Sequence, residues 1–255
     1  MKTPPPGTGH TTLRGTVAAV RAAALAWSEA ILADPAADVD QHDPSGRTAL
    51  MHAAGAGDLD LLDRLLARGA DPDRTDAGGE TALMRAAWSG QVGAIDRLIA
   101  AGADADIPDA YDWTALMHAA ISGHLAPVRR LLSAGARPDR ADRNGMTALM
   151  VSVVPGPHQT AILTALIQSG ADPCVADATG RTLIALCEEK RRPDLIAALD
   201  AALATSALAD TRRRLLHSLP VAERLRLLPA SHAMQCADDV HRGWRRPAVH
   251  GRMAP

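Results

Sequence analysis

Apolar residues recur along this chain in short runs that repeat about every 33 residues. An Ala- and Leu-rich or Leu- and Ile-rich run follows a threonine at five places: Thr48, Thr81, Thr114, Thr147 and Thr182. The first four threonines are 33 residues apart, and the last follows after 35. A second apolar run comes later in each unit, as in Leu61–Leu66. Because such runs suit one face of a short helix, each unit predicts a turn, a helix, a turn and a second helix.

Turn-forming residues mark the ends of these predicted helices. Four units place Gly where the turn needs a positive φ: Gly46, Gly79, Gly145 and Gly180. Asp112 takes this place in the third unit, and Asp tolerates that conformation. The threonine that follows is a good N-cap, and a Gly-Ala pair after the second helix is a typical stop. Two extra residues near Pro155, with Ser152 and Val153 in place of the usual Ala pair, predict altered stacking in the fourth unit.

These units resemble those of the ankyrin-repeat family. The resemblance covers about Asp43 to Ala202, and residues 37–40 resemble the family's Gly-Ala-Asp-x-Asp endings. It implies an all-α solenoid of helix-turn-helix units with β-turn tips, completed by C-terminal capping helices. The family has Pro-Leu-His after the threonine, whereas four units here have Ala-Leu-Met. We therefore expect buried methionine to replace the imidazole that bonds the threonine hydroxyl in the family.

The same pattern predicts the domain organisation. Residues 1–15 are expected to be a flexible N-terminal segment, and residues 16–42 a degenerate capping repeat in whose helix pair Trp27 packs as core. Five repeats follow, at residues 43–75, 76–108, 109–141, 142–176 and 177–202. Residues 203–228 predict two Leu-rich capping helices, and residues 229–255 a basic disordered tail.

Composition mainly excludes classes of fold and site. Hydrophobic residues make up 47% of the chain, but with four Trp, one Tyr and no Phe they favour thin, closely packed helices over an all-β sandwich. No apolar run reaches the roughly 20 residues of a membrane span. Three widely spaced cysteines fit neither a disulfide framework nor a Cys-x-x-Cys metal site. We therefore expect a cytoplasmic monomer without a membrane partner.

No sequence motif predicts catalysis. The chain lacks Gly-x-Gly-x-x-Gly, Walker, His-Glu-x-x-His and Gly-x-Ser-x-Gly sequences, so we expect no enzyme, no cofactor and no metal. His52 and His118 share a helix position with Arg85, which argues against metal ligands there. Acidic residues recur in the loops after the second helices: Asp38, Asp40, Asp71, Asp73, Asp104, Asp106 and Asp139. A calcium site is one interpretation of them, but they match the solvated turns of the resembled family, and we favour that interpretation.

The rare aromatic residues fall where the resemblance implies partner contacts. In ankyrin-repeat proteins the variable contact positions are the second, third, fifth, thirteenth and fourteenth of a unit. Trp88, Tyr111 and Trp113 occupy such positions in adjacent units, and Trp and Tyr are enriched at binding hot spots. Seven further residues surround them at such positions: Arg47, Glu80, Ser89, Ile121, Ser122, Arg143 and Met146. We predict that this concave face binds a protein partner; the alternative is that the tryptophans only cover thin helices.

Charge is distributed unevenly. Residues 43–202 carry −6 and residues 203–255 carry +5, with three arginines around Trp244. This cluster is typical of a small nucleic-acid contact, but we do not expect nucleic acid to be the main partner. We expect a non-catalytic adaptor, scaffold or inhibitor. Two alternative functions stay open. One is a secreted effector whose Pro- and Gly-rich start serves export, and the other is a regulator that contacts nucleic acid through the tail.

Overall fold

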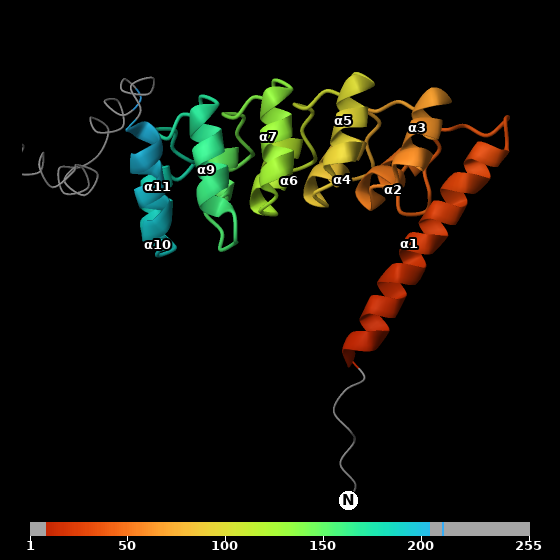
Figure 1. Cartoon of the computed structure of the whole chain (residues 1–255), viewed down its shortest axis with the longest axis horizontal. Coiled ribbons are helices and arrows are strands. Elements are labelled where there is room, and N and C mark those ends of the chain that lie inside the picture. The colour runs from red at the N-terminus through yellow and green to blue at the C-terminus, as the bar shows by residue number, and fades with distance from the viewer. Residues whose placement is uncertain (1–8, 205–210, 212–255) are drawn as a thin grey trace, which may run out of the picture. The chain divides into compact units, whose positions relative to one another are not determined.

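The computed structural model describes residues 9–204 and Thr211. These residues form helices joined by tight turns, together with three isolated antiparallel bridges, so the all-α prediction is confirmed for them (Figure 1). The chain divides into two compact units, Met1–Ala202 and Leu203–Pro255. The capping helices predicted at residues 203–228 lie almost entirely outside the described residues, and the basic tail at 229–255 lies wholly outside them.

The predicted helix pairs are present and stack side by side. A long helix, α1 (Gly9–Ala33), precedes them in the sequence. The pairs are α2 (Ala49–Ala56) with α3 (Leu59–Ala67), α4 (Ala82–Trp88) with α5 (Val92–Ala100), α6 (Ala115–Ile121) with α7 (Leu125–Ser133), α8 (Ala148–Val151) with α9 (Gln159–Gln168), and α10 (Leu183–Glu189) with α11 (Pro193–Leu203). First helices contact first helices of the neighbouring units, and the second helices α3, α5, α7 and α9 contact one another in the same order (Figure 1).

The threonines begin the first helices, as predicted. The Thr48 hydroxyl accepts a hydrogen bond from the Met51 N–H at 3.3 Å, and the Met51 sulfur accepts one from the Thr48 N–H at 3.4 Å. Thr81 and Thr182 cap their helices with the same hydroxyl bond, and the other two threonines hold the N-cap position without it. Met51 is 1% exposed. A buried methionine therefore takes the place of the imidazole that bonds this threonine in the resembled family, as expected.

Each unit opens with an aspartate that organises its turn. Asp142 Oδ1 accepts a hydrogen bond from the Asn144 N–H at 2.8 Å, and Gly145 completes the turn with a φ of 75°. Asp112 adopts a φ of 64° in the equivalent place of the third unit, as predicted. The Ala178 N–H of the next unit donates to the Asn144 carbonyl at 2.8 Å. This bond joins neighbouring turns directly, so side chains on successive turns are held in register.

Small side chains allow the first helices to approach one another. The paired alanines of the first three units are fully buried: Ala53, Ala54, Ala86, Ala87, Ala119 and Ala120. Leu61, Leu65 and Leu98 of the second helices are buried behind them. The core is thus a continuous layer between the two rows of helices, and it fixes the spacing of the turns.

The N-terminal region differs from the prediction. Residues 1–8 of the predicted flexible segment lie outside the described residues, and one helix runs from Gly9 to Ala33, where the end of that segment and a helix pair were expected. The reason is local, because residues 16–33 contain neither Gly nor Pro to end it. Trp27 is only half-buried, and its ring meets His52 edge-on at 6.2 Å. Among the described helices, including this one, none is long and apolar enough to cross a membrane.

The fourth unit is altered, as its sequence predicted. Helix α8 has four residues, whereas the other first helices have seven or eight. It ends at Ser152, whose hydroxyl donates to the Leu149 carbonyl at 2.8 Å. Gln159, after the inserted residues, is buried, and its side-chain oxygen has no hydrogen-bond partner among the described residues. The shortened helix leaves less surface for stacking at this point of the array.

Candidate functional site

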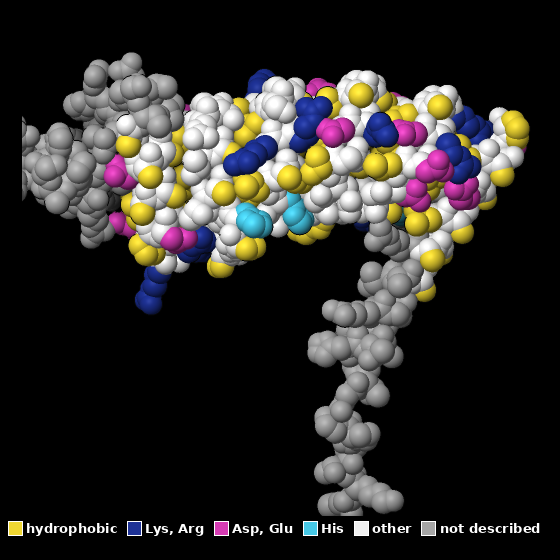
Figure 2. Space-filling view, viewed as in Figure 1, with side chains coloured by type: hydrophobic (Ala, Val, Ile, Leu, Met, Phe, Trp, Pro, Cys, Tyr) yellow, Lys and Arg dark blue, Asp and Glu magenta, His cyan; other side chains and the backbone are white. Residues whose placement is uncertain are grey.

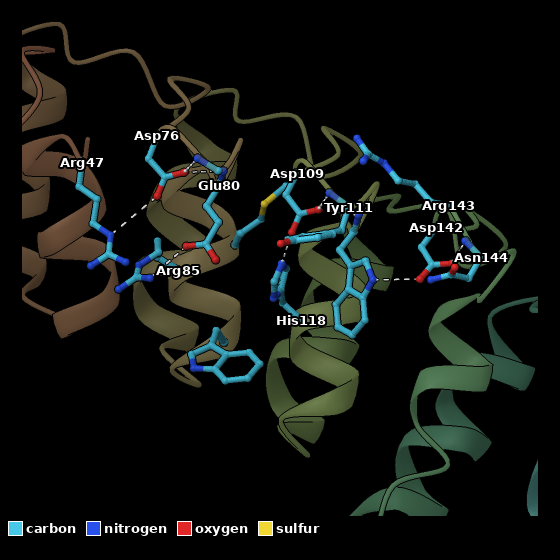
Figure 3. A pocket seen from close by; sticks show the side chains of 14 residues that line it. Arg47, Asp76, Glu80, Arg85, Asp109, Tyr111, His118, Asp142, Arg143 and Asn144 are labelled. Carbon is cyan, nitrogen blue, oxygen red and sulfur yellow. Dashed lines mark hydrogen bonds and ion pairs between the residues drawn. The ribbon is translucent and has the colours of Figure 1, made fainter. Parts of the chain in front are cut away.

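A hollow of about 820 Å³ crosses the turns of the first four units and the first helices of the second and third units, α4 and α6. We call it the pocket (Figure 3). Its floor comes from α4 and α6, and its rim comes from the turns that begin at Asp76, Asp109 and Asp142, with Arg47 at the α2 end. The registered turns therefore bring side chains from four units to one concave surface.

Three aromatic side chains occupy the pocket together. Trp88 at the end of α4 is 53% exposed, and Tyr111 on the next turn is 70% exposed. Trp113 is half-buried, and its indole N–H donates to Asp142 Oδ2 at 3.0 Å. The His118 ring lies between the two tryptophans, with ring centroids 6.0 Å from Trp88 and 5.5 Å from Trp113. Trp113 is thus tied to the scaffold, whereas Trp88 and Tyr111 offer apolar surface.

The turn aspartates use their second carboxylate oxygen within the site. Asp109 Oδ2 lies 3.1 Å from His118 Nε2, and Asp43 Oδ2 lies 2.8 Å from His52 Nε2 in the first unit. Burial of Asp43 opposes its ionisation, but hydrogen bonds from Ser45, from the turn amides and from His52 outweigh it and hold its pKa well below the ordinary value. The histidines therefore serve as partners of turn carboxylates.

Two arginines at the α2 end of the pocket are bonded differently. Arg47 Nε is 3.7 Å from Asp76 Oδ2, which is beyond hydrogen-bond distance, and this buried nitrogen has no hydrogen-bond partner among the described residues. Arg85 donates one hydrogen bond, from Nη1 to Glu80 Oε2 at 3.0 Å. Figure 3 shows both arginine side chains directed toward the same end of the pocket. Most of their N–H groups are thus free of protein acceptors among the described residues.

Comparison with known proteins identifies the family. The model of a family described as ankyrin repeats, in three copies, matches residues 18–109 and again residues 91–177. Together these matches span more than half of the chain. The chain belongs to the ankyrin-repeat family. No curated protein matches it significantly. Ankyrin repeats typically act as protein-interaction modules and are usually non-catalytic, and no enzyme family matches this chain.

Six of the ten residues predicted to contact a partner line the pocket of this ankyrin-repeat protein. They are Arg47, Glu80, Trp88, Tyr111, Trp113 and Arg143. The other four lie outside its lining: Ser89 is exposed, and Ile121, Ser122 and Met146 are half-buried. The role of all ten as partner contacts stays a prediction.

Sequence reasoning missed several lining residues of the ankyrin pocket, among them Arg85, His118 and the turn aspartates. One signal was available. His52 and His118 each lie nine residues after a turn aspartate, as does Arg85. At this position His52 and His118 bond that aspartate, whereas Arg85 bonds Glu80, so what the position shares is a side chain that pairs with a carboxylate of its own unit.

The acidic loops between ankyrin repeats have a structural role. The Asp71 N–H donates to Asp40 Oδ1 at 3.0 Å, and the Asp104 N–H donates to Asp73 Oδ1 at 2.9 Å. Burial raises the pKa of both acceptors, Asp40 and Asp73. Within the described part of the chain, no group of three or more side chains is arranged to hold a metal ion. These contacts support the interpretation of the acids as turn residues that link one repeat to the next.

The outer face of the ankyrin stack offers no comparable site. Acidic and basic side chains alternate over α3, α5 and α7 (Figure 2). They pair between neighbouring helices: Arg97 Nε lies 3.0 Å from Asp63 Oδ1, and Arg130 binds Asp96. Because these exposed charges satisfy one another, this face presents a mixed polar surface.

Proposed function

We propose that this ankyrin-repeat protein is a non-catalytic adaptor, scaffold or inhibitor that binds a protein partner through the pocket. The observation that carries the proposal is the exposure of Trp88 and Tyr111, which line the same pocket from adjacent repeats, 53% and 70% respectively. In the free protein, large aromatic side chains at this exposure leave apolar surface in contact with water. Burial of that surface by a partner contributes favourable binding free energy.

The surroundings of the two rings support the same function. Charged side chains of Arg47, Glu80 and Arg143 border the aromatic centre, and an apolar centre with a polar rim is typical of protein interfaces. The turns that carry the rim are joined by backbone hydrogen bonds, such as Ala110 N–H to the Gly78 carbonyl at 2.8 Å. A surface already held in place loses little conformational entropy on binding.

The test is affinity capture from lysate of the native cells with three full-length baits. These are the wild type, the double variant Trp88→Ala with Tyr111→Ala, and Leu59→Ala as a matched control. Leu59 is also an exposed apolar residue, 36% exposed, but it lies on α3 outside the pocket. Trp113 is left unchanged because its indole supports Asp142. Circular dichroism verifies that all three baits keep their helices.

We expect one protein to be retained by the wild type and by Leu59→Ala but lost from the double variant. Hot-spot aromatics each contribute about 2 kcal/mol or more, so loss of both should weaken binding of the purified partner by roughly 700-fold or more in titration calorimetry. Equal capture by all three baits would show that the pocket is not the binding site.

A further inference from the structure

We infer that the pocket selects a partner segment in which an acidic side chain lies next to an apolar one. The carboxylate binds the guanidinium groups of Arg47 and Arg85, and the apolar side chain covers Trp88. This inference rests on the proposed function and specifies the chemistry of the partner at the same site.

The balance of hydrogen-bonding groups in the pocket favours an acidic ligand. Two of the three rim aspartates are already engaged through both oxygens: Asp109 accepts from two turn amides and pairs with His118, and Asp142 accepts from two turn amides and from Trp113. They therefore have little capacity left for a basic ligand. In contrast, Arg47 makes no side-chain hydrogen bond among the described residues.

The arginine donors are partly withdrawn from water, which increases their value to a ligand. The side chains of Arg47 and Arg85 are 34% and 28% exposed. A guanidinium carries five N–H donors in a planar fork that matches a carboxylate. Glu80 takes one donor of Arg85, and Asp76 lies only at ion-pair distance from Arg47. A carboxylate from outside would supply the acceptors that the protein itself does not.

The position of Trp88 sets the second requirement. Arg85 and Trp88 are three residues apart on α4, so their side chains lie on one face of the helix. A ligand whose carboxylate meets Arg85 therefore places its neighbouring groups over the indole. Because that ring is apolar, a neighbouring aliphatic or aromatic side chain gains most from the contact.

The test uses a displayed library of random 12-residue peptides selected on the full-length wild-type protein. Enriched peptides are synthesised in two forms, with the acidic residue and with its amide, and their affinities are measured by fluorescence anisotropy. The variants are Arg85→Gln, Glu80→Gln and a control, Arg97→Gln. Arg97 is also an arginine paired with a carboxylate, Asp63 at 3.0 Å, but it lies on α5 outside the pocket.

We expect enriched peptides to carry Asp or Glu at a fixed spacing from an apolar residue. Loss of a charge-assisted hydrogen bond should weaken binding about 10-fold or more, both for the amide peptide and for Arg85→Gln. Glu80→Gln removes a competing carboxylate and should strengthen binding up to about 5-fold. Arg97→Gln should change affinity less than about 2-fold.

Other results overturn the inference. The inference is wrong if basic peptides are enriched, or if Arg85→Gln strengthens binding and Glu80→Gln weakens it. The proposed function still holds in that case if Trp88→Ala with Tyr111→Ala abolishes binding. Displacement of the peptide by a 20-nucleotide single-stranded DNA at 0.15 M salt would show an anion site for nucleic acid instead. Failure to enrich any peptide that depends on Trp88 and Tyr111 would count against both proposals.

Discussion

Replacement of Gly145 by Ala should destabilise the protein more than the same change at Gly135. Both glycines have positive φ, 75° and 93°. A left-handed conformation costs Ala about 1 to 2 kcal/mol, offset by about 0.4 to 1 kcal/mol from the unfolded state. At Gly135 a new Cβ meets nothing within 4 Å. Gly135→Ala should therefore lower the free energy of unfolding by only about 1 kcal/mol.

At Gly145 a second cost is added, because the new Cβ would lie 2.7 Å from the Ala178 nitrogen. That N–H donates to the Asn144 carbonyl at 2.8 Å. The turns must separate, and loss of this hydrogen bond costs about 0.5 to 1.5 kcal/mol. Gly145→Ala should therefore lower the free energy of unfolding by about 2 kcal/mol in all. Urea unfolding followed by circular dichroism measures both values, and equal unfolding midpoints for the two variants would refute the role given to turn-to-turn contact.

Two further predictions concern the turn carboxylates. Trp113→Phe removes the donor to Asp142 Oδ2 and should lower the free energy of unfolding by about 1 to 3 kcal/mol. Trp88→Phe changes an exposed ring and should lower it by less than about 0.5 kcal/mol. Urea unfolding of both variants measures these values, and similar losses for the two would contradict the prediction. The lowered pKa of Asp43 adds stability that is present above its ordinary pKa of 3.8 and is lost as pH falls below that value. Asp43→Asn should thus be destabilised relative to wild type at pH 7 and by a smaller amount at pH 3, where only part of the contribution has been lost, and a pH-independent difference would be the contrary result.

The helix pairs were predictable because their signals are local. A threonine cap, a glycine with positive φ and an apolar run each lie within a few residues, and the repeat multiplies the evidence. Residues 9–33 lack that repetition, and there the helix extends further than predicted because Ala-rich sequence continues without a break. The position of Thr48 fixes where α2 begins, whereas nothing between Thr16 and Ala33 ends α1.

The candidate site was predictable only in part. The clustering of Trp88, Tyr111 and Trp113 follows from the repeat, because equivalent positions of adjacent units are neighbours. The bonding between units does not follow from it. Trp113 reaches Asp142 of the next unit, and Arg47 stops at 3.7 Å from Asp76. Such distances depend on side-chain rotamers and on the rise between units, which a sequence pattern does not specify.

The turn aspartates show how this protein can change its specificity at a constant backbone. In each turn Oδ1 maintains the backbone, as Asp109 does for the Tyr111 and Trp113 amides at 2.8 and 2.9 Å. Oδ2 takes no part in the turn, and its partner is His118 in one unit and Trp113 in another. One donor to Oδ2 can therefore be exchanged for another by a single substitution that leaves the backbone of the turn unchanged. New binding preferences can arise at these positions while the same repeat architecture is inherited unchanged.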